Sequence, residues 1–229
     1  MRGRVKWIVL ITGMIAVIII CHRAGERLKH LILDERETSA SVSETGSVIV
    51  LDPGHGGVDA GKIGINNAEE KEINLKISLK IKKLLEGNGI TVVMTRTDDN
   101  RLADTQKEDL KERVRIMNEE QPALAVSIHQ NSYQGEGVRG PQVFYYADSK
   151  EGKTAAGILQ EKLNQITPAY SRDEKGNNSY YILKNTEVPV VIVECGFLSN
   201  ADEAAELVSD EYQDAMAAAV TEGIKQYIE

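Results

Sequence analysis

The sequence predicts an α/β domain over residues 47–229, preceded by a segment directed to a membrane. From Ser47 onward, short apolar runs alternate with longer segments rich in Lys, Glu and Leu. The short runs are rich in Val and Ile, which is typical of strands that are covered on both faces. This order of strands and helices predicts one domain in which helices flank a sheet.

Residues 1–21 begin with basic residues and continue as an uncharged run, WIVLITGMIAVIIIC. The run is shorter than the roughly 20 residues of a membrane-spanning helix, but it suits a signal peptide or a short signal anchor. Isoleucines precede Cys21 where a cleavage site or lipobox would need small residues, so an uncleaved anchor is favoured. Residues 22–46 are polar and rich in Ser, Thr and Glu, which predicts a linker.

The apolar runs of the domain are expected to be strands, because they are rich in β-branched or aromatic residues and are bounded by polar or turn-forming residues. In chain order they are residues 48–51, 91–94, 124–128, 142–146, 180–183 and 188–193.

The segments between these runs are expected to be helices. In residues 73–85 the apolar side chains alternate as in a strand, yet several of them also share one helical face. The length, the Lys and Leu content and the glycines that follow favour a helix. A second helix is expected from Asp104 to about Glu120, and one or two over residues 201–228, capped by Ser199 or Asn200.

The charge of the chain argues against nucleic-acid binding. The formal net charge is −8, and the first 40 residues are net basic, so the domain is more acidic than the whole chain. An acidic domain is a poor candidate for nonspecific binding to nucleic acid. Cys21 and Cys195 are the only cysteines, and one of them lies at the membrane segment, so no intrachain disulfide framework is expected.

Two of the four histidines follow predicted strands. His55 lies in VIVLDPGH and His129 lies in LAVSIHQNS, whereas His22 and His30 lie beside the membrane segment and are expected to be solvated. Sites in α/β proteins are usually built at strand ends and in the loops that leave them. His55 and His129 are therefore candidate metal ligands.

A catalytic zinc site needs about three protein ligands, typically histidines with a carboxylate. Spacing alone does not choose the carboxylate. The candidates near His55 in the sequence are Asp52, Asp59, Glu69, Glu70 and Glu72.

Glu194 is a further candidate because it follows a run of β-branched residues in VVIVECGF. Burying an unpaired charge is costly, so Glu194 is expected at a strand end, either with a structural partner or with a chemical role. Cys195 is expected to point to the opposite side of the strand and to belong to the core.

Several blocks of the sequence resemble the zinc-dependent N-acetylmuramoyl-L-alanine amidases of the amidase-3 family. They are VIVLDPGHGGVDAGKIG, EEKEINL, GITVVMTRTDD, LKERVRIMN, SIHQNS and VPVVIVECGFLSN, and they occur in the family's order from about Val48 to Ile228. The blocks GVRGPQVFYY and YYILKNTEVPVVIVECGFLSN further resemble the CwlD subgroup, which is associated with sporulation and germination.

The resemblance implies a role for each of four residues. The family's metal ligands fall on His55, on Glu70, which precedes Lys71, and on His129, with Zn2+ as the cofactor. The family's catalytic glutamate falls on Glu194. The choice of Glu70 over its acidic neighbours comes from the family pattern alone.

The resemblance also implies a mixed sheet of about six strands flanked by helices, and a domain outside the cytoplasmic membrane, facing peptidoglycan. The implied reaction is hydrolysis of the amide between N-acetylmuramic acid and L-alanine, in the vegetative wall or in the spore cortex as a step towards muramic-δ-lactam. Two alternatives stay open, a zinc peptidase that cleaves other peptide bonds and an inactive wall-binding scaffold. An accessory or activating protein is a further candidate partner.

Overall fold

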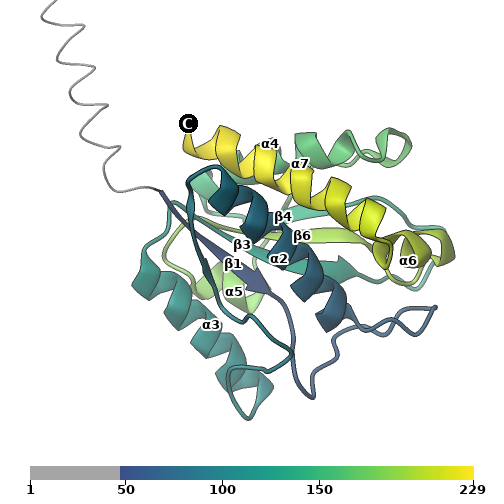
Figure 1. Ribbon diagram of the computed structural model, residues 1–229, viewed down its shortest axis with the longest axis horizontal. Coiled ribbons are helices and arrows are strands. Elements are labelled where there is room, and N and C mark those ends of the chain that lie inside the picture. Colours follow the sequence, from purple (N-terminus) through teal and green to yellow (C-terminus); the bar gives the residue numbers. More distant parts are fainter. Residues whose placement is uncertain (1–46) are drawn as a thin grey trace, which may run out of the picture. The chain divides into compact units, whose positions relative to one another are not determined.

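The computed structural model describes residues 47–229, which form one six-stranded sheet with helices on both faces (Figure 1). The strand order is β2-β1-β3-β6-β4-β5. Strands β2, β1, β3 and β6 are parallel, β4 is antiparallel to β6, and β5 is parallel to β4. The predicted mixed sheet is thus confirmed. The strands are β1 (Val48–Pro53), β2 (Thr91–Met94), β3 (Leu124–Asn131), β4 (Gln142–Tyr146), β5 (Lys175–Asn177) and β6 (Val190–Phe197).

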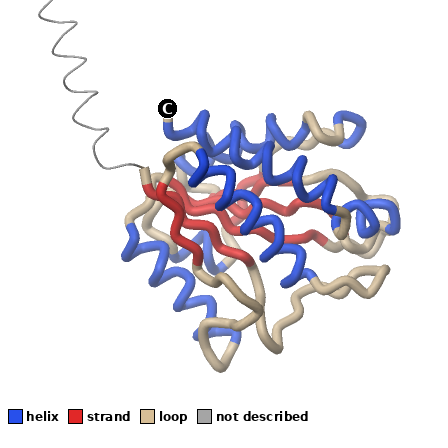
Figure 2. The backbone as a smooth tube through the Cα atoms, in the orientation of Figure 1, coloured by secondary structure: helices blue, strands red, loops and turns tan. Residues whose placement is uncertain are grey.

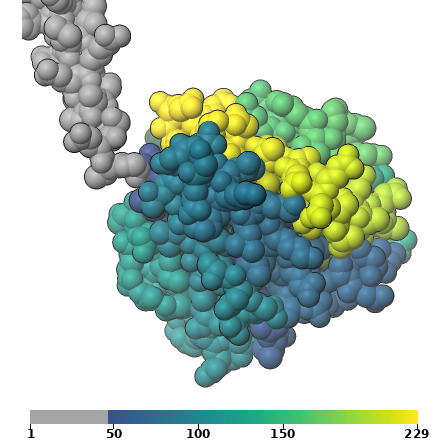
Figure 3. Space-filling model, viewed as in Figure 1, coloured from purple at the N-terminus to yellow at the C-terminus, as the bar shows by residue number. Residues whose placement is uncertain are grey.

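The helices form a layer on each side of the sheet (Figure 2). Helices α2 and α7 lie side by side on the face that the space-filling view presents (Figure 3), and α4 packs beside α7. Helices α3 and α5 contact each other on the other side. The helices are α2 (Glu70–Gly87), α3 (Gln106–Glu120), α4 (Lys150–Asn164), the 3-10 turn η1 (Pro168–Tyr170), α5 (Tyr181–Asn185), α6 (Ala201–Leu207) and α7 (Asp210–Ile228).

Alternation along the central strands divides the core into two apolar clusters. In β1, Ile49 and Leu51 pack with α2, α4 and α7, whereas Val50 packs with Val114 of α3 and Ile182 of α5. Successive strand residues point to opposite faces, so each strand supplies both clusters. The expectation that these strands are covered on both faces is confirmed.

Residues 73–85, whose apolar pattern fits both a strand and a helix, lie in the helix α2, as predicted. Ile73, Ile77, Ile81 and Leu85 are buried at helical spacing, and Leu79 remains 40% exposed. The Asn200 side chain caps α6 by accepting a hydrogen bond from the backbone N–H of Glu203, as the sequence indicated.

The predicted strand over residues 180–183 is wrong. These residues fall at the start of α5, where Ile182 and Leu183 are both buried. Consecutive buried side chains suit a short helix that lies against the sheet. The same apolar pattern also fits a strand covered on both faces, so the sequence does not separate the two. The edge strand next to β4 is instead β5, whose sequence KGN carries no apolar signal.

Residues 1–46, which include His22 and His30, lie outside the described residues. The predictions for residues 1–21 and 22–46 therefore stay predictions. Among residues 47–229, no helix is both long enough and apolar enough to cross a membrane.

Candidate active site

The predicted site residues gather where the parallel strands β1, β3 and β6 end. His55 lies two residues after the end of β1, and His129 lies near the end of β3. Glu194 is the cross-strand partner of His129 in the β3–β6 pairing. Because these strands are parallel, their carboxyl ends meet at one edge of the sheet. The expected strand-end location of Glu194 needs one correction, since β6 continues to Phe197 beyond a shift in register.

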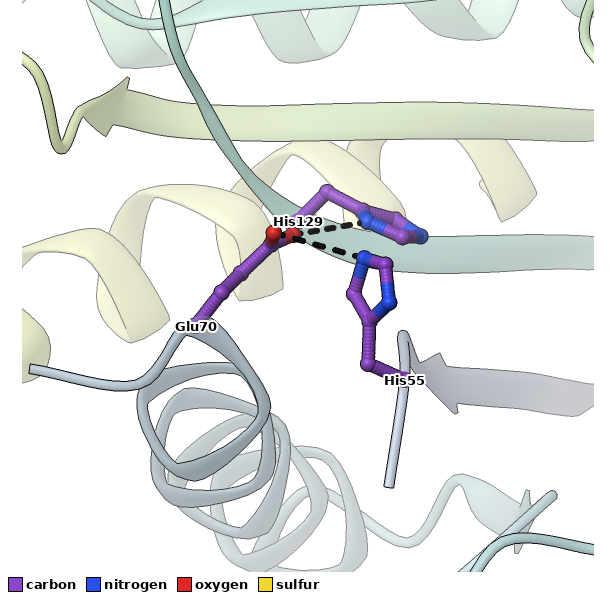
Figure 4. A group of neighbouring side chains, drawn as sticks. All are labelled: His55, Glu70 and His129. Atoms are coloured by element: carbon purple, nitrogen blue, oxygen red, sulfur yellow. Dashed lines mark hydrogen bonds and ion pairs between the residues drawn. The ribbon is translucent and has the colours of Figure 1, made fainter. Parts of the chain in front are cut away.

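Glu70 reaches this edge from the first turn of α2 and lies between the two histidines (Figure 4). Its Oε1 atom is 2.9 Å from His129 Nδ1, and its Oε2 atom is 3.3 Å from His55 Nε2. The ligand atoms of the three residues all lie within 4.8 Å of one another. Among the five candidate carboxylates, Glu70 is therefore the one that contacts both histidines.

The three side chains fit a divalent metal ion. Two ligands of a tetrahedral zinc ion, each about 2.0–2.1 Å from it, lie about 3.3 Å apart, which is close to the two contacts of Glu70. Two imidazoles and a carboxylate are also a ligand set typical of catalytic zinc. These residues could hold a metal ion with one coordination position left for a reactant.

Glu70 is held in place by hydrogen bonds from three directions. Its Oε2 atom accepts from the backbone N–H of Lys62 at 2.8 Å, and its Oε1 atom accepts from that of Gln130 at 3.0 Å and from Asn74 Nδ2 at 3.3 Å. Burial raises the pKa of this carboxyl, but hydrogen bonds and charge from His129 and His55 outweigh burial and hold the pKa below its ordinary value. Glu70 is therefore ionised and oriented before any cation binds.

Asp59 orients the His55 ring from the side away from Glu70. Its Oδ2 atom is 3.0 Å from His55 Nδ1. A proton on Nδ1, donated to this carboxylate, leaves Nε2 as the ring nitrogen that faces Glu70 and is free to bind a metal ion. In the sequence, Asp59 is only one of several candidate ligands, because spacing does not distinguish a ligand from a residue that supports one.

The remaining carboxylate candidates have other partners or are exposed. Asp52 is fully buried and pairs with Arg113 at 2.6 Å, and Glu69 pairs with Lys71 at 3.3 Å. Glu72 lies on an exposed position of α2. None of these residues contacts the histidines through a hydrogen bond or ion pair within the described part of the chain.

Glu194 is a buried carboxylate with a free oxygen. The residue is 8% exposed, and its Oε2 atom has no hydrogen-bond partner among residues 47–229. Burial raises the pKa of Glu194 to about 7, against the opposing charge of His129. A carboxylate with a pKa near neutrality and an unpartnered oxygen is suited to accept and return a proton.

A cavity of about 340 Å³ connects these groups. It is lined by His55, His129 and Glu194, and also by Leu110 of α3 and by Tyr180 and Tyr181 at the start of α5. Residues 180–183, which the sequence predicted as a strand, thus contribute to the wall of the site. A ligand in this cavity would meet His55, His129 and Glu194 together.

Cys195 belongs to the core, as predicted. It is fully buried in the cluster formed with α2 and α7, on the face opposite Glu194. Burial raises the pKa of its thiol, so the thiol stays protonated at neutral pH. Cys195 is not a nucleophile of this site.

The metal-free protein is expected to lose stability as the pH rises from about 5 to 9. The neighbouring Glu70 and Asp59 outweigh burial and raise the pKa of His55 from 6.5 to about 9, so its contribution is complete below pH 6.5 and is lost as the pH rises through 9. The raised pKa of Glu194 acts in the same direction between about 4.5 and 7. Thermal unfolding in the presence of a chelator measures this fall. In Glu194→Gln the part below pH 7 should shrink, and a melting temperature that does not change with pH would contradict the assignment.

Comparison with known proteins gives consistent matches. The family Amidase_3, described as N-acetylmuramoyl-L-alanine amidase, matches residues 49–226. The germination-specific N-acetylmuramoyl-L-alanine amidase of Bacillus subtilis (strain 168) is 31% identical over 236 residues, which cover 99% of this chain and 96% of that protein.

Two solved structures share the fold. The CwlD amidase from Clostridioides difficile, solved in complex with the GerS lipoprotein, is 35% identical with a TM-score of 0.76, over 80% of this chain and 98% of that one. The catalytic domain of CwlV from Bacillus (Paenibacillus) polymyxa var. colistinus is 31% identical with a TM-score of 0.71, over 80% of this chain and 98% of that one.

Proposed function

The chain belongs to the amidase-3 family and is an N-acetylmuramoyl-L-alanine amidase that acts on peptidoglycan. We propose that it is a zinc enzyme. His55, Glu70 and His129 would hold the zinc ion, and Glu194 would transfer the proton. The observation that supports this best is that His55 and His129 line one cavity with Glu194, while Glu70 contacts both histidines.

The amide between the lactyl group of muramic acid and L-alanine resists water, because its carbonyl is a poor electrophile and its nitrogen is a poor leaving group. A zinc ion, when bound, supplies Lewis acidity that polarises the carbonyl and lowers the pKa of water to about 7. Glu194 then takes the proton of the attacking water and delivers it to the departing amine of L-alanine. One carboxylate with a pKa near 7 serves both transfers.

The cellular setting follows from the relatives and from the N-terminal segment. The matched Bacillus subtilis amidase is germination-specific, so we propose that this chain acts on spore cortex and removes the peptide before another enzyme forms muramic-δ-lactam. We propose that the domain acts outside the cytoplasmic membrane, where its substrate lies, and that residues 1–21 serve as a signal anchor or signal peptide. The CwlD amidase was solved with a lipoprotein, which supports an accessory protein as a partner here too.

Digestion of purified sacculi by the zinc-loaded protein tests the proposal. Mass spectrometry should find muramic acid without peptide, together with free stem peptides that begin with L-alanine. A zinc peptidase would instead leave shortened peptides on muramic acid, and a wall-binding scaffold would release nothing. Activity that persists after zinc is removed by a chelator would contradict the metal assignment.

Asp59→Ala is expected to weaken zinc binding by about 10- to 100-fold, because the loss of the hydrogen bond to Nδ1 frees the His55 ring. Titration of zinc against a chromophoric chelator measures the change. Asp173→Ala removes an exposed carboxylate elsewhere in the chain and serves as the control, with zinc affinity unchanged. Equal zinc affinity in Asp59→Ala and the wild-type protein would argue against this role for Asp59.

A further inference from the structure

Two buried arginines hold the backbone of the loop that carries His55. Arg113 donates from Nη1 to the carbonyl of Pro53 and from Nη2 to the carbonyl of His55, both at 2.7 Å. Arg96 donates from Nε to the carbonyl of Pro53 and from Nη2 to the carbonyl of Gly54, both at 2.9 Å. The carbonyls of three consecutive residues therefore all accept from guanidinium groups.

Both guanidinium groups are themselves fixed from several sides. Arg113 is 1% exposed and forms ion pairs with Asp52 and Asp109, each at 2.6 Å. Arg96 is 4% exposed and also donates to the carbonyls of Asp98 and Lys71, each at 2.8 Å. Because the guanidinium fork is planar and rigid, each arginine fixes the relative positions of all its partners.

The backbone at His55 needs such support. Its φ angle is 63°, in the left-handed region, which a residue with a side chain rarely adopts unless its surroundings enforce it. That conformation directs Nε2 of the ring towards Glu70, at 3.3 Å. Without the arginines, the carbonyls of residues 53–55 would lose these partners, and the loop would be free to relax away from this geometry.

Charge balance does not account for two buried arginines at this position. Burial and the positive charge of Arg113 lower the pKa of Arg96 to about 10, so the two groups repel each other while both stay charged at neutral pH. Asp52 and Asp109 offset part of this cost.

We propose that Arg96 and Arg113 are positioning residues, which hold the loop at residues 53–55 in the conformation that binds zinc. They act through the backbone carbonyls of residues 53–55 and not as ligands of the metal. This inference rests on the proposed metal site at His55, Glu70 and His129. It predicts that the zinc affinity of the folded protein depends on the guanidinium groups and not only on the positive charge.

The test compares Arg113→Lys and Arg96→Lys with the wild-type protein. Lysine keeps the charge, but its single ammonium cannot bridge the same set of carbonyls. At a temperature where circular dichroism shows each metal-free protein to be folded, zinc is titrated against a chromophoric chelator. We expect a dissociation constant about tenfold or more above that of the wild-type protein in each variant that folds.

Arg115→Lys is the matched control, because Arg115 lies on the same helix and forms exposed ion pairs with Glu112 and Glu119. Its zinc affinity should equal that of the wild-type protein. The absorption spectrum of the Co2+-substituted protein gives a second readout, because it reports the geometry around the metal. It should change in Arg113→Lys and Arg96→Lys and stay the same in Arg115→Lys.

A purely structural role would lower the melting temperature of the metal-free variants and leave the zinc affinity and the Co2+ spectrum of the folded protein unchanged. That result in both lysine variants would overturn the inference. If the wild-type protein itself bound no zinc, the proposed metal site would fail and the inference with it, so the two failures are distinguishable.

Discussion

Glu194→Gln is expected to lower the turnover of muropeptides by about 10²–10⁴-fold while zinc stays bound at the wild-type level. The amide keeps the shape of the side chain but cannot accept a proton from water. The substitution also removes a carboxylate that is 8% exposed and has an oxygen without a partner among the described residues, so the melting temperature should not fall at neutral pH. Mass analysis of the released products and metal analysis of the purified protein measure the two effects.

His129→Ala is the informative comparison, because it removes a proposed ligand in place of the proposed base. It should lose both zinc and activity, since Glu70 and His55 alone leave the ion with two protein ligands. The two variants thus separate metal binding from proton transfer. Normal turnover by metal-loaded Glu194→Gln would refute the role given to Glu194.

The central strands were predictable because they carry a strong local signal. Val48 to Leu51 and the runs of β3 and β6 are apolar on both faces, and the structure buries them between two layers of helices. The strand β5 and the helix α5 were not predictable in this way. β5 is a polar edge strand, and α5 owes its conformation to packing against α3 and the sheet, which a local pattern does not record.

For the site, the residue types pointed to a histidine and carboxylate group, but the sequence could not choose the carboxylate without the family pattern. The choice depends on how α2 approaches the sheet, which places Glu70 between the histidines and directs Glu69 to Lys71. The supporting residues are harder still to foresee. Asp52 and Arg113 are 61 residues apart in the sequence and meet only in the folded domain.

Gly54→Ala is expected to disable the metal site as thoroughly as the loss of a ligand, although Gly54 has no side chain to offer. A Cβ atom at this position would lie 2.2 Å from Cε1 and 2.3 Å from Nε2 of the His129 ring. Either the ring or the loop must therefore move. The loop cannot easily retreat, because the Gly54 carbonyl is held by Arg96 at 2.9 Å and by Asn74 at 3.1 Å.

The ring is then the part that is displaced, and its 2.9 Å contact with Glu70 is lost. Zinc content and activity should fall to the level of His129→Ala, while circular dichroism still shows a folded domain. Gly87→Ala, at the end of α2, is the control, because a Cβ atom there meets nothing within 4 Å. Zinc binding at the wild-type level in Gly54→Ala would show that the His129 ring has room to shift while keeping the metal. In that case, the close packing of glycine against imidazole would not be what positions the second histidine.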